Sequence, residues 1–472
     1  MVLETDQKAL EINLDDRFYG TFAEIGAGQE VARYFFQVGA AAGTIAKSMS
    51  AYDKTVSDEI YGTEEKGKGR YVCEPRLYRM LDHEYGLLEN RLREERPGQN
   101  FFAFANTVSA INYQKTNKGD GWLGLRFQLD PESAPNDLVL HVRLLDNDNR
   151  LQQQAIGILG VNLIYACFRY AAEPETLLRS LMDKLKDRVQ IDMVRLEGPE
   201  FQSFDRCLLS LWVVKNGLSD IAIFDPTGRP VHAGEFLYKK SVLIARGSYR
   251  PPTLVQQDMI RCAHEQFIRE IAQNGDAVFF LTEITLDNLR ASGEMEERDF
   301  LDRAEMLCAL GQTVIISNFA QHKKLIAYFS DYRVQRIGIA MGVRKLRNIV
   351  LQTYQNNPGN LLSAFGEIFL KNVRFYIYPA TATEGEISAD DALLTSQNMD
   401  IPEDIHFLYQ YLLDNKNIVD IQHFNRDVLD IFQKDVLRMI QDGSAGWESK
   451  VPKTVADLIH AKKLFLRRTV DG

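Results

Sequence analysis

A carboxylate within an apolar segment is the first feature of this sequence that could do chemistry. Glu283 lies in AVFFLTEIT (277–285), which has the length and composition of a buried β-strand. Burying a carboxylate is costly unless a cation, a cluster of donors or a ligand meets it. Glu283 is therefore a candidate catalytic acid or base. A salt bridge with a lysine or arginine of a neighbouring strand is the structural alternative.

A histidine follows a second apolar segment. His322 comes shortly after TVIISNF (313–319), just past the point where a strand would end. Imidazole exchanges protons near neutral pH, so we predict His322 as a second catalytic candidate. A solvated residue in the first turn of a helix is the alternative.

Cations flank two further apolar segments, KSVLIARG (240–247) and RIGIAMG (336–342). Lysine and arginine together can hold an anionic group, and arginine offers a bidentate fork. We predict an anion-binding role for these cations, each of which is also compatible with an ordinary surface charge. They are Lys240, Arg246, Arg344 and Lys345.

Three more polar residues lie in or beside predicted strands, where α/β proteins gather their ligands. Asp192, Asp225 and Asn318 are the remaining site candidates. His141 and Arg143 alternate along another predicted strand and share a face, which we interpret as its polar face.

Several familiar chemistries lack their motifs. The segment at 26–28 reads Gly-Ala-Gly, but Val31 stands where the third glycine of a dinucleotide-binding loop belongs, and no P-loop lysine follows. This favours a simple helix N-terminal turn over a phosphate loop. The five cysteines are dispersed without metal-ligand spacing, which indicates reduced thiols and predicts no metal site. The sequence identifies no cofactor.

The elements that must position these residues alternate along the chain. FFAFANTVSA (101–110) and a hairpin formed by GWLGLRFQLD and DLVLHVRLLD precede a long apolar helix at 152–171. After it, short apolar strands alternate with helices, which is typical of a mainly parallel sheet covered on both faces. The fold class is therefore α/β, with a barrel-like and a doubly wound open sheet as the two alternatives.

Three regions are expected along the chain. Residues 1–98 form a helical N-terminal region packed on the core. It includes a buried helix or a close helix pair over VARYFFQVGAAAGTIAKSMSAYD (31–53) and a basic, Gly-containing break at 64–71. Residues 99–380 form the α/β core. Residues 381–472 hold an acidic loop, the C-terminal helices and a basic tail.

Composition limits the partners. The net charge of −10 argues against a nonspecific grip on nucleic acid. The sequence has no uninterrupted apolar stretch of the roughly 18 residues that suggest a spanning helix. Its acidic start lacks the features of a signal peptide, so we expect a cytoplasmic protein.

A family resemblance covers almost the whole chain. It rests on GAGQEVARYFFQVGAAAGTIAKSMSAYDKTVSDEIYG, RYVCEPRLYRMLDHEYGLL, GDGWLGLRFQ, ILGVNLIYACF, DFLDRAEMLCALGQTVIISNF and WESKVPKTVADLI. These segments resemble an uncharacterised family of bacterial and chloroplast proteins, and the resemblance implies a cyanobacterial or similar source.

Members of that family carry the names TonB-dependent receptor or nicotinate-nucleotide adenylyltransferase. The sequence supports neither name. A receptor barrel needs an export signal and many amphipathic strands, and the His-x-Gly-His motif of the transferase is replaced by His232-Ala-Gly-Glu235. The resemblance implies no assigned active site.

Two functions remain open at this point. The first is an enzyme for a small anionic or phosphorylated metabolite, with Glu283 and His322 as proton carriers and Lys240 with Arg246 holding the anion. The second is a non-catalytic scaffold or regulatory protein that uses its helical extensions for homo-oligomer or partner contacts. Convergence of Glu283, His322 and a basic pair in one cleft would favour the enzyme.

Overall fold

The computed structural model describes residues 2–62, 71–271, 278–291, 295–357, 359–370, 372–382 and 393–465. The predicted basic break, apart from Tyr71, lies outside these residues, as do residues 383–392 of the acidic connection and the end of the basic tail. The described chain divides into two compact units, Met1–Ala222 and Ile223–Gly472. Each has its own sheet, where the sequence predicted one core sheet.

The sheet of the first unit is mixed. Among the described residues it has the order β2-β1-β3-β4-β5-β6, with parallel pairing of β1 to β2 and β3 and antiparallel pairing from β3 to β6. The predicted hairpin is the β4–β5 pair. The strands are β1 (Phe18–Gly26), β2 (Ile45–Ala51), β3 (Asn100–Ser109), β4 (Gly119–Phe127), β5 (Asn136–Leu144) and β6 (Val189–Glu197).

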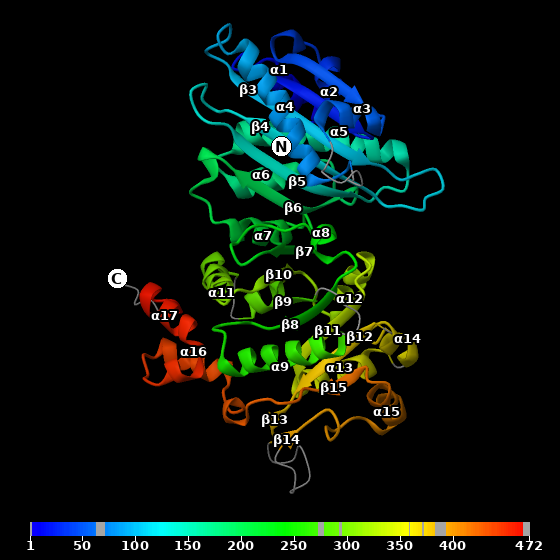
Figure 1. Cartoon of the computed structure of the whole chain (residues 1–472), viewed down its shortest axis with the longest axis vertical. Coiled ribbons are helices and arrows are strands. Elements are labelled where there is room, and N and C mark those ends of the chain that lie inside the picture. Colours follow the sequence, from blue (N-terminus) through cyan, green and yellow to red (C-terminus); the bar gives the residue numbers. More distant parts are fainter. Residues whose placement is uncertain are drawn as a thin grey trace. The chain divides into compact units, whose positions relative to one another are not determined.

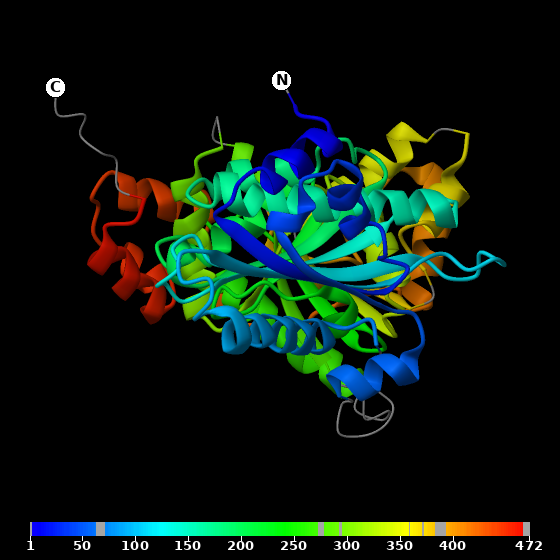
Figure 2. The ribbon, with the colours of Figure 1, turned by 90° about the horizontal axis from the view of Figure 1, so that it is seen from above.

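Helices cover both faces of this sheet. Figure 2 shows α4 (light blue) on one side and α1 (dark blue) with α5 (teal) on the other. Side chains alternate accordingly, because Ala103 and Ala105 of β3 pack with Leu81 of α4, whereas the ring of Phe102 lies 5.6 Å from that of Phe168 in α5. The helices are α1 (Thr5–Asn13), α2 (Val31–Gln37), α3 (Lys54–Tyr61), α4 (Glu74–Leu92), α5 (Asn149–Tyr170), α6 (Pro174–Leu181) and α7 (Arg206–Lys215).

The long helix α5 is a core helix of this unit. Among the described helices it is the one long and apolar enough to cross a membrane by length and composition, but 78% of its most apolar window is buried. Such burial is what a central helix of a folded unit shows.

The predicted helix over residues 31–53 is wrong in its second half. The chain is helical only in α2, and β2 then pairs in parallel with β1 at the sheet edge. Its residues, IAKSMSA, are mostly small or polar and partly exposed, so they lack the apolar run that marks a buried strand. Strands β1 and β2 thus bring part of the region predicted as helical into the first sheet.

The Gly-Ala-Gly segment is a strand-to-helix turn, and two amides at the start of the helix that follows are already engaged. The Glu24 carboxylate accepts hydrogen bonds from the backbone N–H groups of Val31 (2.9 Å) and Ala32 (3.3 Å), at the start of α2. A Cβ on Gly28 would lie 2.1 Å from Oδ1 of Asn106, so close packing explains this glycine. The structure confirms the turn interpretation.

The second unit contains a parallel sheet of the doubly wound kind. Among the described residues its order is β15-β12-β11-β8-β9-β10-β7, and the pairs from β15 through to β10 are all parallel. Because β8 and β11 are neighbours while the chain continues outward from each in opposite directions, this is the strand order of doubly wound sheets (Figure 1). The sheet is open, so the barrel alternative is excluded.

Both faces of its strands are buried, as the apolar segments predicted. Leu243 and Ala245 of β8 pack against Phe267 of α9, and the intervening Val242 and Ile244 are also fully buried. The strands are β7 (Ile221–Phe224), β8 (Ser241–Arg246), β9 (Val278–Thr285), β10 (Thr313–Ser317), β11 (Arg336–Gly342), β12 (Val373–Tyr378) and β15 (Ile418–Asp420), beside a small pair, β13 (Ala380–Thr381) and β14 (Leu393–Leu394).

The C-terminal helices belong to this unit. Val436 of α16 and Val455 of α17 join Met306 of α11 in one apolar cluster. The helices are α8 (Ala233–Leu237), α9 (Leu254–Ile271), α10 (Leu286–Arg290), α11 (Glu297–Ala309), α12 (His322–Asp331), α13 (Val343–Asn356), α14 (Leu361–Gly366), α15 (His406–Asp414), α16 (Gln433–Gln441) and α17 (Lys453–Lys462).

Candidate functional site

The candidate site lies at the carboxyl edge of the second sheet. Strands β8, β9, β10 and β11 are parallel neighbours, so their carboxyl ends meet at one edge. The connections after β8 and β11 lead away in opposite directions, which makes this the topological switch point where open α/β sheets bind their ligands. Arg246 ends β8, and Lys345 lies in the first turn of α13 directly after β11.

Glu283 is fully buried and paired. It lies opposite Arg246 in the β8–β9 register, and its relative exposure is 0%. The guanidinium donates from Nε to Oε2 at 2.7 Å and from Nη2 to Oε1 at 2.9 Å. Ser317, at the end of β10, donates its hydroxyl to Oε1 at 2.5 Å. The salt-bridge alternative for Glu283 is therefore the arrangement present, and this carboxylate positions Arg246.

Arg246 links this buried pair to the loop after β10. Its Nη1 donates to the carbonyl oxygen of Ala320 at 3.2 Å. The loop then leads into α12, whose first residue is His322. The guanidinium is close enough to His322 to oppose protonation of the imidazole.

His322 is a buried imidazole that faces cations. Its relative exposure is 6%, and it lines a cavity of about 160 Å³. Burial, followed by the charges of Arg246 and Lys345, holds the pKa of His322 well below its ordinary value. Within the described part of the chain, no hydrogen-bond partner meets its ring. Burial and the two cations therefore favour the neutral imidazole.

Lys345 lines the same cavity from α13. Desolvation, and then the charge of Arg246, lowers the pKa of its ammonium group, although the residue keeps an exposed side. No carboxylate among residues 2–62, 71–271, 278–291 and the later described ranges pairs with it. Lys345 is thus a cation available to a ligand at the solvent-facing side of the cavity.

Polar and apolar side chains form the rest of the cavity wall. Gln352, Thr353 and Asn356 of α13 follow Lys345 along one helical face and line the cavity with it. A space of this size holds on the order of five waters, or one small ligand. Lys323 also lines the cavity but forms an ion pair with Glu367, and Arg246 lies outside the lining. Lys345, a neutral imidazole and uncharged polar groups can bind a small anion.

The other predicted anion holders lie elsewhere. Lys240 precedes β8, at the amino edge of the sheet, and its ammonium group lies 4.4 Å from the ring centre of Phe279. Arg344 donates to the carbonyl oxygen of Thr381 at 2.8 Å and does not line the cavity. Lys240 and Arg246 flank the same strand, one before its start and one at its end. The length of β8 therefore places them at opposite edges of the sheet.

The strand-end candidates also disperse. Asn318 is exposed in the loop after β10, near the cavity-lining segment that begins at Ala320. Asp225 accepts hydrogen bonds from the backbone of Thr227 and Arg229 within its own turn.

Asp192 lies in the first unit. It is buried, and its Oδ1 is 2.7 Å from Nδ1 of His141. Burial alone would lower the pKa of His141, but the carboxylates of Asp192 and Asp120 outweigh it and raise that pKa to about 9. His141 was interpreted as part of a polar face. It is instead a buried partner of Asp192, which lies on the neighbouring strand β6 at the irregularity in its pairing with β5.

The polar wall contributed by α13 was missed from the sequence. The signal was present, since Lys345, Ile349, Gln352 and Asn356 recur at the three- and four-residue spacing of one helical face. A polar helical face is most often solvated, so the spacing alone does not separate a cavity wall from a surface.

Comparisons with known proteins give no family. No protein-family model and no curated protein matches the chain. These comparisons neither support nor contradict the two names carried by the family that the sequence resembles.

Solved structures give faint likenesses over about a third of the chain. The competence/damage-inducible protein CihA from Agrobacterium tumefaciens is 14% identical over 34% of this chain and 94% of its own, with a TM-score of 0.26. A CinA superfamily protein from Klebsiella pneumoniae is 11% identical over 35% and 98%, with a TM-score of 0.27. One from Escherichia coli is 10% identical over 35% and 95%, with a TM-score of 0.24.

Proposed function

We propose that this protein is an enzyme that binds a small anionic or phosphorylated metabolite at the carboxyl edge of its second sheet. The observation that carries the proposal is the pair formed by His322 and Lys345, which face one cavity without a carboxylate partner among the described residues. Arg246 lies outside the cavity lining, and its charge is paired with that of Glu283. In this proposal Lys345 holds the anion, and His322 accepts a proton from it or from a bound co-substrate.

An anion in this cavity changes the protonation of its surroundings. The pKa of His322 is lowered by burial and by two cations, and a bound negative charge opposes that effect. Binding should therefore be accompanied by proton uptake near neutral pH. This distinguishes the proposed site from a surface cluster of lysines, which stays protonated throughout.

The test begins with a thermal-shift screen of phosphorylated and carboxylated metabolites, because a ligand of the native state raises the melting temperature. For any ligand found, calorimetry in two buffers of different ionisation enthalpy measures proton uptake. We expect Lys345→Gln to weaken binding at least tenfold, and His322→Gln to reduce proton uptake and abolish turnover. Lys324→Gln, an exposed residue on α12 outside the cavity, is the matched control. Unchanged binding by Lys345→Gln would refute the proposal.

A contact surface is the second candidate function, and one observation favours it. Phe407 and Tyr411 of α15 are one helical turn apart and are 87% and 61% exposed. If the ligand screen is negative and sedimentation shows self-association that Phe407→Ser removes, the scaffold function replaces the enzyme.

A further inference from the structure

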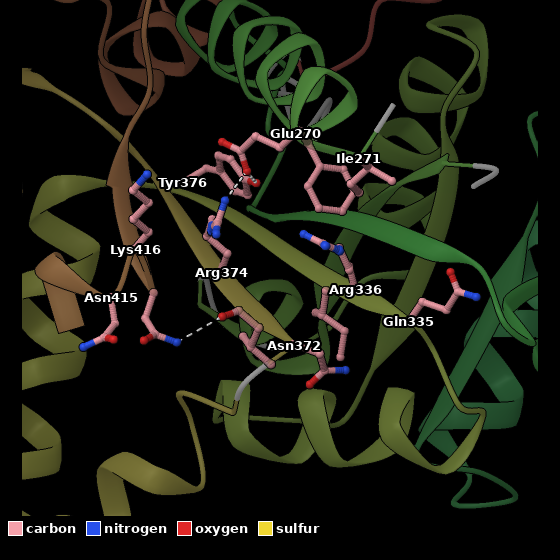
Figure 3. Close-up of a pocket in the computed structure, with 13 residues that line it drawn as sticks. Glu270, Ile271, Gln335, Arg336, Asn372, Arg374, Tyr376, Asn415 and Lys416 are labelled. Atoms are coloured by element: carbon pink, nitrogen blue, oxygen red, sulfur yellow. Dashed lines mark hydrogen bonds and ion pairs between the residues drawn. The ribbon is translucent and has the colours of Figure 1, made fainter. Parts of the chain in front are cut away.

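A second cavity, of about 470 Å³, lies at the opposite edge of the same sheet. It opens where β11, β12 and β15 begin, beside the last turn of α9 (Figure 3). Its volume is within the range of small-molecule sites. None of the residues assigned above to the carboxyl-edge site lines it.

The lining of this cavity is positively charged. It contains three cations, Arg336, Arg374 and Lys416, and one carboxylate, Glu270. Glu270 is already engaged, because Arg374 forms an ion pair with it and the Tyr376 hydroxyl donates to Oε2 at 2.6 Å. Figure 3 shows this group joined by dashed lines. Subtracting that pair leaves two positive charges.

Those two charges have no carboxylate partner within the described ranges of the chain. Arg336 begins β11 and Lys416 lies in the turn before β15, so the sheet places them on strands either side of β12. In Figure 3 the side chains of Arg336 and Lys416 flank Arg374. Two unpaired cations that flank one strand of the cavity wall can hold a doubly charged group such as a phosphate monoester.

Carboxamides supply the second kind of contact. The side-chain N–H groups of Asn372, Asn415 and Asn417 donate to the carbonyl oxygens of Val334 (3.3 Å), Tyr411 (2.8 Å) and Val373 (3.5 Å). Over the described residues, no donor reaches the three amide oxygens. They are acceptors without donors, and hydroxyl groups are the donors that match them.

The floor of the cavity is rigid and apolar. Phe267 of α9 lies against Gly338 of β11, where an added Cβ would come within 3.1 Å of the ring. Phe267 and Ile337 are buried and line the cavity below its polar rim. The carbon skeleton of a compact ligand can pack on such a floor.

We propose that this cavity binds a phosphorylated sugar or polyol. Arg336 and Lys416 hold the phosphate. The amide oxygens of Asn372, Asn415 and Asn417 accept hydrogen bonds from the hydroxyl groups. The site is separate from the carboxyl-edge cavity and does not depend on the function proposed there.

Calorimetry on the full chain with ribose 5-phosphate tests this assignment, with ribose and inorganic phosphate as the two half-ligands. We expect ribose 5-phosphate to bind at least tenfold more tightly than either half. Arg336→Gln and Lys416→Gln should each weaken binding at least tenfold without lowering the melting temperature, because both residues are exposed. Asn372→Ala should weaken the binding of ribose 5-phosphate but leave the affinity for inorganic phosphate unchanged.

Three outcomes overturn the proposal. Absence of ribose 5-phosphate binding does so directly. Equal affinities for ribose 5-phosphate and inorganic phosphate would show that the sugar makes no favourable contacts. Binding lost in Lys345→Gln but retained in Arg336→Gln places the ligand at the carboxyl edge, which supports the function proposed above while refuting this site. Lys324→Gln is again the control of equal charge.

Discussion

At the scale of single residues, the cost of burying a carboxylate correctly predicted that Glu283 has a partner. The sequence alone did not identify that partner. The segment AVFFLTEIT predicts a buried carboxylate because its neighbours are apolar. Several lysines and arginines lie at the ends of other strands, and only the strand order decides which is adjacent. The β8–β9 register places Arg246 opposite Glu283. Glu283 therefore holds Arg246 in position and is not free to act as a base.

Glu283→Gln should lower the free energy of unfolding by about 3 kcal/mol, because Arg246, itself only 9% exposed, loses its buried counter-charge. Urea denaturation of the variant and the native protein measures this difference. Glu367→Gln breaks the exposed ion pair with Lys323 and should cost less than about 1 kcal/mol. If the two variants lose equal stability, the buried Arg246–Glu283 pair does not stabilise the protein more than an exposed ion pair does.

At the scale of elements, long apolar strands were predictable and the polar edge strand was not. The segments that became β8, β9, β10 and β11 each carry an uninterrupted apolar run, which a strand buried on both faces requires. β2 lies at an edge with half of its residues exposed, so its sequence carries no such run. Its small residues suit a helix equally well, and pairing with β1 decides the outcome.

The start of α2 yields a pH-dependent prediction. Burial raises the pKa of Glu24 to about 7, and hydrogen bonds from the amides of Val31 and Ala32, with one from Asn106, only partly oppose that rise. A carboxyl group with a raised folded pKa contributes stability below its unfolded value of 4.5, and that contribution is lost as the pH rises through about 7.

Glu24→Gln removes the titration and keeps one acceptor oxygen. Because Val31 donates to Oε1 and Ala32 to Oε2, one of these two hydrogen bonds is lost at every pH. The variant's stability relative to the native protein should therefore increase between pH 4.5 and pH 8, by about 3 kcal/mol in total. Chemical denaturation at a series of pH values measures this difference. A difference that stays constant with pH would contradict the assignment of the raised pKa to Glu24.

At the scale of the whole molecule, the α/β class was predictable and the number of sheets was not. Alternating strands and helices indicate parallel pairing, but they do not say to which sheet a strand belongs. β6 and β7 are successive strands that join different sheets. The candidate site followed the same rule, since Arg246, His322 and Lys345 converge through strand order, whereas Lys240 is carried to the opposite edge.

The two compact units should respond differently to a core mutation in one of them. The apolar cluster around α4 contains residues of the first unit only, and those around α9 and α17 contain residues of the second only. Phe104 of β3 is fully buried, and Phe104→Ala should destabilise its own unit by about 3 to 5 kcal/mol. Hydrogen exchange followed by mass spectrometry should then show faster exchange in β1, β3 and β4 and unchanged exchange in β8, β9 and β11. Tyr113→Ala, at a fully exposed position, should change the exchange rates in neither set of strands.

Equal acceleration of exchange in both sheets would show that the chain unfolds as one cooperative body. Mutations in the first unit would then have to be considered in every binding test of the second.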